Sequence, residues 1–277
     1  MGTQAMMDTT FDISGKVVVL TGGSGTLGSS WARHLAGAGA KIVILGSTPS
    51  RVEKVKKNLL KTTPDILGFA GSVLDRSHLE QIKGKVLKKW GRIDALVNAA
   101  GGNRPGATIG KEETIFDLNL EDFKQVTRLN LDGTVIPSIV FGEAMADQKT
   151  GSIINISSMT ATQAVTRVVG YSASKAAIDN FTRWMAVEMA RKFSQNIRVN
   201  AIAPGFFIAN QNRKLLVEED GSYTQRGQAI IGKTPMNRFG APEELNGALH
   251  WLISDASSFV TGTILPVDGG FSAFSGV

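Results

Sequence analysis

Several short aliphatic runs in this 277-residue chain are apolar at nearly every position rather than at alternate positions. Val17-Val18-Val19-Leu20 and Ile42-Val43-Ile44-Leu45 are the clearest of them. A strand that is apolar on both sides must be buried on both sides. This pattern is typical of a parallel sheet that is covered by helices on each face.

These runs alternate with longer segments of helical period. Leu27, Trp31 and Leu35 recur every four residues, and a second stripe of apolar residues follows Ile178. Six repeats of strand and helix predict an α/β fold, a single doubly wound Rossmann-type domain with about seven parallel strands over residues 1–277. The expected strands are Lys16–Thr21, Lys41–Leu45, Ile66–Ala70, Ile93–Asn98, Ser152–Ser157, Ile197–Ile202 and Thr263–Val267.

Composition narrows the chemistry. Charged residues make up 19% of the chain, below the roughly 25% of average globular proteins, which fits a well-filled core. The absence of cysteine excludes disulfides, thiolate nucleophiles and zinc–thiolate sites, and the three histidines lie too far apart in sequence to suggest a metal site. No apolar run approaches the roughly 18 residues of a membrane span, and residues 1–15 lack the features of a signal peptide. We therefore expect a cytoplasmic protein with no membrane partner.

The net charge of +6 and the pI of about 9.5 raise the question of nucleic-acid binding. Most of the surplus lies in Arg51 to Lys61 and Lys83 to Arg92, where basic residues alternate with apolar ones at helical spacing. This pattern is typical of solvated helix faces. We expect no nucleic-acid partner and only a general preference for small anionic ligands.

A glycine-rich turn joins the first buried strand to the first helix, in the segment Val17 to Gly28. Glycines allow a tight turn and a close approach of a pyrophosphate, and the helix N-terminus offers N–H groups and a positive dipole end. Placed after the first strand, the turn predicts a dinucleotide site.

The end of the second strand bears on which dinucleotide binds. A carboxylate is expected there to hold the ribose 2′-hydroxyl, yet no Asp or Glu occurs between Asp12 and Glu53. Its absence removes the repulsion of a 2′-phosphate, which Ser47, Thr48 and Arg51 could hold. This favours NADP(H); NAD(H) is the alternative, and so is a loop that serves neither role.

Tyr171 and Lys175 lie four residues apart at the start of a helical segment and so share one face. The unperturbed pKa of tyrosine is about 10, and a neighbouring ammonium favours the phenolate and lowers that pKa towards the working range of an acid–base catalyst. Ser157-Ser158 ends the fifth strand, where open parallel sheets bind ligands. A hydroxyl there can donate a hydrogen bond to a substrate carbonyl oxygen.

Taken in order, these motifs resemble the short-chain dehydrogenase/reductase family. The resemblance spans about residues 13–271, and it rests on the Thr21–Gly28 turn, Asn98-Ala99-Ala100-Gly101, Asn130, Ser158 thirteen residues before Tyr171, Lys175, and Pro204-Gly205. It implies that Tyr171 is the general acid/base and that Ser158 orients the carbonyl. It also implies that Lys175 binds the nicotinamide ribose and lowers the tyrosine pKa, that Asn130 holds a relay water, and that the protein is a homotetramer.

The same resemblance implies a set of cofactor contacts along the carboxyl ends of the strands. They are Gly22, Ser24, Thr26, Leu27, Ser47, Ser72, Val73, Asn98, Ala99, Gly101, Tyr171, Lys175, Pro204 and Gly205. Four positions depart from the family pattern: Thr26 replaces a glycine, Ala99 an asparagine, Ser72 an aspartate and Ala209 a threonine. The departures affect cofactor affinity and preference more than proton transfer.

Two polar segments suggest the substrate. One follows the fourth strand, and the other is an expected substrate-side insertion at residues 206–235. Together with the C-terminal tail they are similar to the D-mannonate oxidoreductase (fructuronate reductase) branch of the family, which implies interconversion of a ring-opened hexuronate ketone and its aldonate. The candidates are Arg104 and Arg167 for the carboxylate and Asn103, Asn210 and Asn212 for the hydroxyls.

Three alternatives remain. One is another sugar-ketone reductase such as a gluconate 5-dehydrogenase. The second is a 3-ketoacyl-carrier-protein reductase, against which the long polar insertions weigh. The third is a nucleotide-binding regulator without chemistry, against which the presence of Ser158, Tyr171 and Lys175 weighs.

Overall fold

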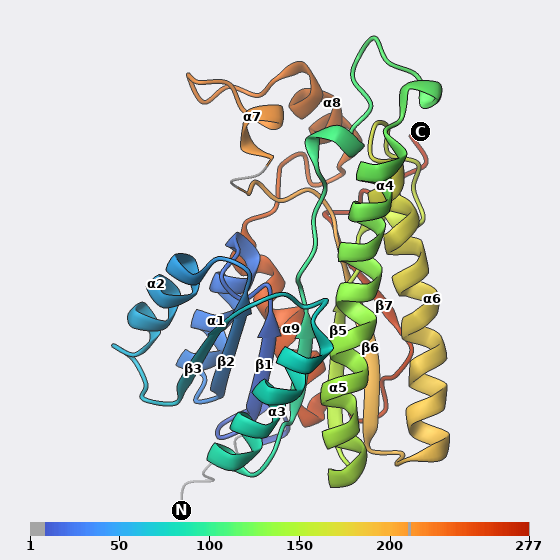
Figure 1. Cartoon of the computed structure of the whole chain (residues 1–277). Helices are drawn as coiled ribbons and strands as arrows, with labels where there is room; N and C mark the ends of the chain where they lie inside the picture. Colours follow the sequence, from blue (N-terminus) through green and yellow to red (C-terminus); the bar gives the residue numbers. More distant parts are fainter. Residues whose placement is uncertain (1–8, 210–211, 277) are drawn as a thin grey trace, which may run out of the picture.

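A computed structural model describes residues 9–209 and 212–276, and its centre is one seven-stranded parallel sheet in the order β3-β2-β1-β4-β5-β6-β7 (Figure 1). The strands are β1 (Val17–Thr21), β2 (Lys41–Gly46), β3 (Ile66–Ala70), β4 (Ala95–Asn98), β5 (Gly151–Ile156), β6 (Ile197–Pro204) and β7 (Ile264–Val267). The predicted fold class and all seven strands are confirmed, each end within two residues.

Helices cover both faces of the sheet. They are α1 (Thr26–Gly37), α2 (Pro49–Leu59), α3 (Arg76–Trp90), α4 (Leu120–Thr127), α5 (Gly133–Gln148), α6 (Val169–Lys192), α7 (Arg213–Leu216), α8 (Gln225–Lys233) and α9 (Asn246–Ile253). Val18 and Leu20 pack into the core with α1, α2 and α9, whereas Val17 and Val19 pack into the core with α3, α5 and α6. This two-sided burial is what the continuous apolar runs predicted. Throughout the described ranges, no helix has the length and apolarity that a membrane crossing requires.

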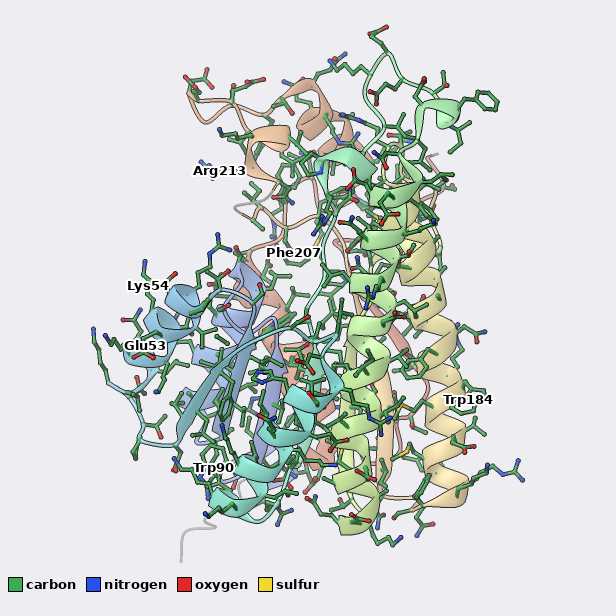
Figure 2. All side chains as sticks on the ribbon, viewed as in Figure 1. Glu53, Lys54, Trp90, Trp184, Phe207 and Arg213 are labelled. Carbon is green, nitrogen blue, oxygen red and sulfur yellow. The ribbon has the colours of Figure 1, made fainter. Side chains whose placement is uncertain are left out.

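The two basic stretches form α2 and the second half of α3. Val52, Leu59 and Val86 are buried, while most of the charged side chains, such as Lys54, extend into solvent (Figure 2). They are solvated helix faces, as predicted.

The strand order reverses between β1 and β4, which pair side by side although β2 and β3 separate them in sequence. Open α/β sheets bind ligands in the crevice at such a switch point. The Thr21 hydroxyl connects β1 to the segment after β4 at this switch point, because its Oγ1 accepts hydrogen bonds from the N–H groups of Ala99 at 3.1 Å and Ala100 at 3.2 Å.

A π-helical turn, Arg128–Asp132, joins α4 to α5 and places Asn130 at full burial beside the end of β4. Such turns widen the helix by one residue and are frequent at functional sites.

Residues 206–240, which we call the cap, leave the sheet after β6 and carry α7 and α8 beyond the carboxyl ends of the strands (Figure 1). The cap includes the predicted insertion 206–235 and has a small apolar cluster of its own. The buried members are Leu216, Val217, Ile230, Ile231 and Phe239. Phe207 forms a β-bridge with Gly240, so the two ends of the cap meet at its base.

Candidate active site

The glycine turn after β1 is as tight as its sequence predicts. Gly22 has φ +66°, and a Cβ there would lie 2.6 Å from Ala99 O, while a Cβ on Gly28 would lie 2.3 Å from Gly22 O. Neither position has room for a side chain. Gly25 precedes α1 and supplies no side-chain cap, so the first turn of this 12-residue helix can present its N–H groups to an anion. The cradle fits a dinucleotide pyrophosphate.

Polar side chains surround the end of β2, next to this turn. Ser24 packs over Gly46, where a Cβ would lie 2.3 Å from Ser24 Oγ. Ser47 and Arg51 are exposed, and no side chain caps the N-terminus of α2 after Thr48. Within the described residues, Arg51 has no ion pair, so this corner can accept a phosphate.

The segment after β3 reaches towards the start of α5. Val73 is buried, and its Cγ2 would lie 3.0 Å from a Cβ on Gly133, whereas Ser72 is exposed. The Ser72 hydroxyl accepts a hydrogen bond from the Leu74 N–H at 3.1 Å. Ser72 therefore stabilises its own turn at the rim of the crevice.

Asn98 is directed into the interior instead of the crevice. Its Nδ2 donates to Ser138 Oγ at 2.8 Å and to Asn155 Oδ1 at 2.9 Å, and Asn155 Nδ2 donates to Thr182 Oγ1 at 2.9 Å. This buried chain ties β4 and β5 to α5 and α6. Asn98 Oδ1 is buried without a hydrogen-bond partner in the described part of the chain.

Ser158, Tyr171 and Lys175 come together, as their sequence spacing predicts. Ser158 follows β5, and Tyr171 and Lys175 lie one turn apart near the start of α6. The Ser158 and Tyr171 hydroxyls share a hydrogen bond. Lys175 Nζ lies 5.3 Å from the centre of the Tyr171 ring and donates to Ile156 O at 2.7 Å. This arrangement can pass a proton to or from an oxygen that binds between the two hydroxyls.

The electrostatics of this group differ from the simple expectation. Burial raises the pKa of Tyr171, and its hydrogen bond with Ser158 acts in the opposite direction. Burial lowers the pKa of Lys175 to about 8, although the charge of Asp179 opposes this shift. In the protein alone, therefore, desolvation determines the tyrosine pKa, and the predicted lowering by Lys175 is absent.

Asn130 is fully buried and uses its side chain to hold the turn after β4. Its Nδ2 donates to Gly102 O and Val126 O, both at 2.8 Å, and its Oδ1 accepts from the Gly102 N–H at 3.1 Å. A Cβ on Gly101 would lie 2.5 Å from Asn130 Oδ1 and 3.7 Å from Lys175 Nζ. The side chain has no donor left for a water, so the predicted relay role would fall to the backbone of this turn.

Ser157 and Asp179 form a buried pair next to Lys175; the sequence patterns had pointed to Ser157 only as part of the Ser157-Ser158 strand end, and to Asp179 not at all. The Ser157 hydroxyl donates to Asp179 Oδ1, and both side chains are buried. Burial raises the pKa of Asp179, while Ser157 and the charges of Arg183 and Lys175 oppose the shift. A signal was present in the sequence: Tyr171, Lys175 and Asp179 follow one another at four-residue spacing on α6.

Among the predicted substrate residues, Arg167 is the most constrained. It has φ +79°, and its Nε donates to Ile109 O at 2.7 Å. Arg104 is exposed and hydrogen-bonds to Gln125. Arg167 thus joins the loop before α6 to the segment that follows β4.

The predicted asparagines have different surroundings. Asn103 Nδ2 donates to Thr108 Oγ1 at 2.7 Å, and Asn103 Oδ1 is buried with no hydrogen bond to the described residues. Asn212 is used within the cap, where its Oδ1 accepts from the Ala209 N–H at 2.7 Å and its Nδ2 donates to Phe207 O at 2.9 Å. Asn210 lies outside the described residues.

Pro204 ends β6, and Gly205 packs against the C-terminal segment, since a Cβ there would lie 2.6 Å from the Cα of Asp268. This turn fixes the base of the cap at the same edge of the sheet as the glycine turn and Ser158. The described candidates for cofactor and catalysis therefore lie along the carboxyl ends of β1 to β6, while several of them, Asn98 above all, support the site from within.

Comparisons with known proteins agree with this geometry. A family profile described as enoyl-(acyl carrier protein) reductase matches residues 23–272. An uncharacterized oxidoreductase of Bacillus subtilis named UxuB is 44% identical over 275 residues, covering 96% of this chain and 98% of the relative.

Solved structures match over the same length. The crystal structure of a Haemophilus influenzae protein provisionally described as a D-mannonate oxidoreductase, with bound NAD, has a TM-score of 0.89 and 39% identity, covering 98% of this chain and all of the other. A protein of Beutenbergia cavernae provisionally described as an NAD(P)-dependent gluconate 5-dehydrogenase, with NADP at low occupancy, has a TM-score of 0.83 and 30% identity, covering 96% and 100%.

Proposed function

The chain belongs to the short-chain dehydrogenase/reductase family and is an NAD(P)-dependent oxidoreductase, and we propose that it interconverts the keto and alcohol forms of a sugar acid. The observation that carries the chemistry is the grouping of Ser158, Tyr171 and Lys175 beside the glycine turn. A dinucleotide held on that turn would extend along the carboxyl ends of the strands towards the two hydroxyls.

When bound, a nicotinamide cofactor would supply or accept the hydride, while the protein would place the substrate and move the proton. In the reductive direction the Tyr171 hydroxyl gives its proton to the carbonyl oxygen, and in the oxidative direction it takes the proton back. Ser158 donates a hydrogen bond to the same oxygen and stabilises the charge that develops on it. Lys175, whose pKa burial lowers to about 8, provides a buried amine that can bind ribose hydroxyls.

Two features support a sugar acid as substrate. The segment after β4 and the cap carry amide and guanidinium groups, and these groups suit hydroxyls and a carboxylate. The structural neighbours are described as D-mannonate and gluconate oxidoreductases. A hexuronate ketone of the fructuronate type accounts for both features, and a 5-keto-gluconate is the second candidate because of the gluconate neighbour.

For the cofactor we favour NADP(H). Ser47 and Arg51 are exposed at the end of β2, and no carboxylate is present at the position where it would repel a 2′-phosphate. The neighbours include one with NAD and one with NADP, so NAD(H) is the alternative. A cytoplasmic location follows from the need for a pool of this cofactor.

We also propose a homotetramer. Ile139 on α5 and Trp184 and Val187 on α6 are 48%, 61% and 57% exposed, and Figure 2 shows Trp184 projecting away from the domain. Large exposed apolar side chains on outer helices are typical of subunit contacts. The open edge of β7 provides a second surface, and two interfaces suffice for a tetramer.

The experiment is a rate comparison with NADPH and NADH over D-fructuronate, D-tagaturonate, 5-keto-D-gluconate and an acetoacetyl thioester. We expect the highest kcat/KM with a keto-uronate, and Tyr171→Phe should lower that rate at least 100-fold while cofactor binding persists. Clear activity on the thioester with none on any keto sugar acid would refute the proposal. Unchanged turnover in Tyr171→Phe would remove Tyr171 from the mechanism.

A further inference from the structure

Two arginines from different parts of the chain lie close together where α8 of the cap meets the loop before α6. Arg226, on α8, donates from Nη1 to Thr166 Oγ1 at 3.4 Å, and Thr166 immediately precedes Arg167. Both guanidinium side chains are half-buried. Burial and the positive charge of Arg167 lower the pKa of Arg226, so the two cations experience one another.

Among the described residues, no acidic group pairs with either arginine. In the ranges that the structure describes, neither Arg167 nor Arg226 takes part in an ion pair, whereas Arg92 pairs with Asp94 and Arg238 with Glu244. Two like charges held together away from bulk water repel one another unless an anion binds between them. The two guanidinium groups therefore form a site of positive charge that an anionic ligand can neutralise.

Arg167 is fixed in its position by contacts in which, over the described part of the chain, its terminal nitrogens take no share. Its Nε donates to Ile109 O at 2.7 Å, and its carbonyl accepts from the Ile109 N–H at 3.0 Å. It also keeps a left-handed backbone conformation, which a non-glycine residue adopts rarely and which is frequent at ligand sites. A guanidinium held in this way is preorganised to form two parallel hydrogen bonds with a carboxylate.

The pair lies close to the proposed reacting centre along the chain. The loop that carries Thr166 and Arg167 follows Ser158 and leads into α6, whose first turn carries Tyr171. The hydroxyls of Ser158 and Tyr171 are hydrogen-bonded to one another. Arg167 lies four positions before Tyr171, a span of at most about 14 Å of backbone. A substrate whose carbonyl meets the two hydroxyls can thus extend a carboxylate towards the arginines.

We propose that Arg167 and Arg226 form a two-armed clamp for the carboxylate of the substrate, with Arg226 as a specificity-determining residue supplied by the cap. This proposal rests on the function proposed above. Arg226 takes the place that the sequence had suggested for Arg104, which is exposed and bonded to Gln125. One arm is thus carried by α8 and the other by the loop before α6.

The test compares Arg226→Gln with Lys233→Gln, which removes an exposed charge from the same helix. Calorimetry at saturating cofactor measures binding of D-mannonate against the neutral D-mannitol, and kinetics compare D-fructuronate with D-fructose. We expect Arg226→Gln to weaken D-mannonate binding and raise the KM for D-fructuronate at least tenfold. Its cofactor Kd, its rate on the neutral ketone and its melting temperature should stay near those of the wild type, and Lys233→Gln should resemble the wild type throughout. Arg226→Lys keeps the charge but loses the fork, so it should recover only part of the affinity.

The outcomes separate the two proposals. If the wild type reduces D-fructuronate and Arg226→Gln does so with the same KM, the clamp is wrong and the function stands. If D-mannonate binds in an Arg226-dependent way but no keto acid is reduced, the clamp stands and the function fails. Equal losses for charged and neutral ligands, or a weaker cofactor Kd, would overturn the clamp.

Discussion

The buried hydroxyl of Ser157 donates a hydrogen bond to the carboxylate of Asp179, one helical turn beyond Lys175 on α6. The serine belongs to the end of β5, so this bond ties the helix that carries Tyr171 to the strand end that carries Ser158. The charge of Asp179 also raises the pKa of Lys175 against the effect of burial. Asp179 is therefore a positioning residue whose influence passes through the lysine.

Asp179→Asn keeps an oxygen that can accept the Ser157 hydrogen bond but removes the charge. We expect the pKa of Lys175, about 8 in the wild type, to fall further because burial is then less opposed. The alkaline limb of the kcat/KM profile should move to lower pH, with little change in KM for the cofactor. A loss of melting temperature with an unshifted profile would mean that Asp179 is only structural.

Lys175→Met should abolish activity and yet stabilise the protein without cofactor. The folded-state pKa of Lys175, about 8, lies below its ordinary value of 10.5, so the folded protein disfavours the ammonium. This shift corresponds to about 3 kcal/mol, from which the lost hydrogen bond to Ile156 O subtracts roughly 1 kcal/mol. We expect a net gain of about 1–2 kcal/mol at pH 7, measured by denaturant unfolding.

The pH dependence provides the check on this effect. Because the pKa is depressed on folding, stability from Lys175 is fully present above about pH 10.5 and is lost as the pH falls through about 8. Wild-type stability should therefore rise relative to Lys175→Met as the pH increases through this window. A constant difference between the two proteins would contradict the burial argument.

Gly28→Ala should damage the cofactor cradle. The new Cβ would lie 2.3 Å from Gly22 O, so the turn has to open, at a cost of about 1–3 kcal/mol and with at least tenfold weaker cofactor binding. Gly37→Ala, at the other end of α1, meets nothing within 4 Å and should be neutral or stabilising by up to about 1 kcal/mol. Fluorescence titration with NADPH and thermal melts of both variants decide the matter, and equal cofactor affinity in the two would be evidence against the cradle.

Arg51→Gln tests the preference for a 2′-phosphate. Arg51 is exposed beside the end of β2, and we expect its loss to raise the KM for NADPH severalfold and to leave the KM for NADH unchanged. Lys54→Gln is the matched control, since Lys54 extends into solvent from the same helix (Figure 2). An equal effect on both cofactors would argue for a general electrostatic attraction, and no effect would leave Arg51 without this role.

Trp184→Glu should disrupt the proposed assembly. A carboxylate on the apolar face of α5 and α6 would have to be desolvated in a subunit interface, at a cost of several kcal/mol. Light scattering should show a shift from tetramer to smaller species, and Lys57→Glu on α2 should show none. If the wild type is a monomer, or if Trp184→Glu keeps its mass, the face has another purpose.

Local sequence patterns predicted the sheet because a strand that is buried on both faces is apolar at nearly every position. Ile66–Ala70 was predicted at its observed bounds, although its burial is only partial. The proximity of Tyr171 and Lys175 could be predicted equally well, because residues four apart in a helix lie next to each other. Features of this kind depend on one element at a time.

The remaining parts of the site depend on where separate elements meet. Arg226 becomes a candidate only because it contacts Thr166, 60 residues earlier in the chain. No periodic pattern in the sequence indicates that contact. Asn98 and Asn130 illustrate the converse: their positions fitted a motif, but their side-chain bonds are internal. The direction of the pKa shift of Tyr171 could not be predicted either. The sequence shows a neighbouring lysine but does not show how deeply the tyrosine is buried.

The bridge between Phe207 and Gly240 means that the cap begins and ends at one point, and its apolar side chains pack largely among themselves. Between these two anchors, a segment built in this way can be lengthened, shortened or replaced during evolution without disturbing the register of β6. The proton-transfer group stays with the sheet while the part that selects the acid varies. A lineage can therefore acquire new substrates by exchanging about thirty residues, and the rest of the domain is inherited unchanged.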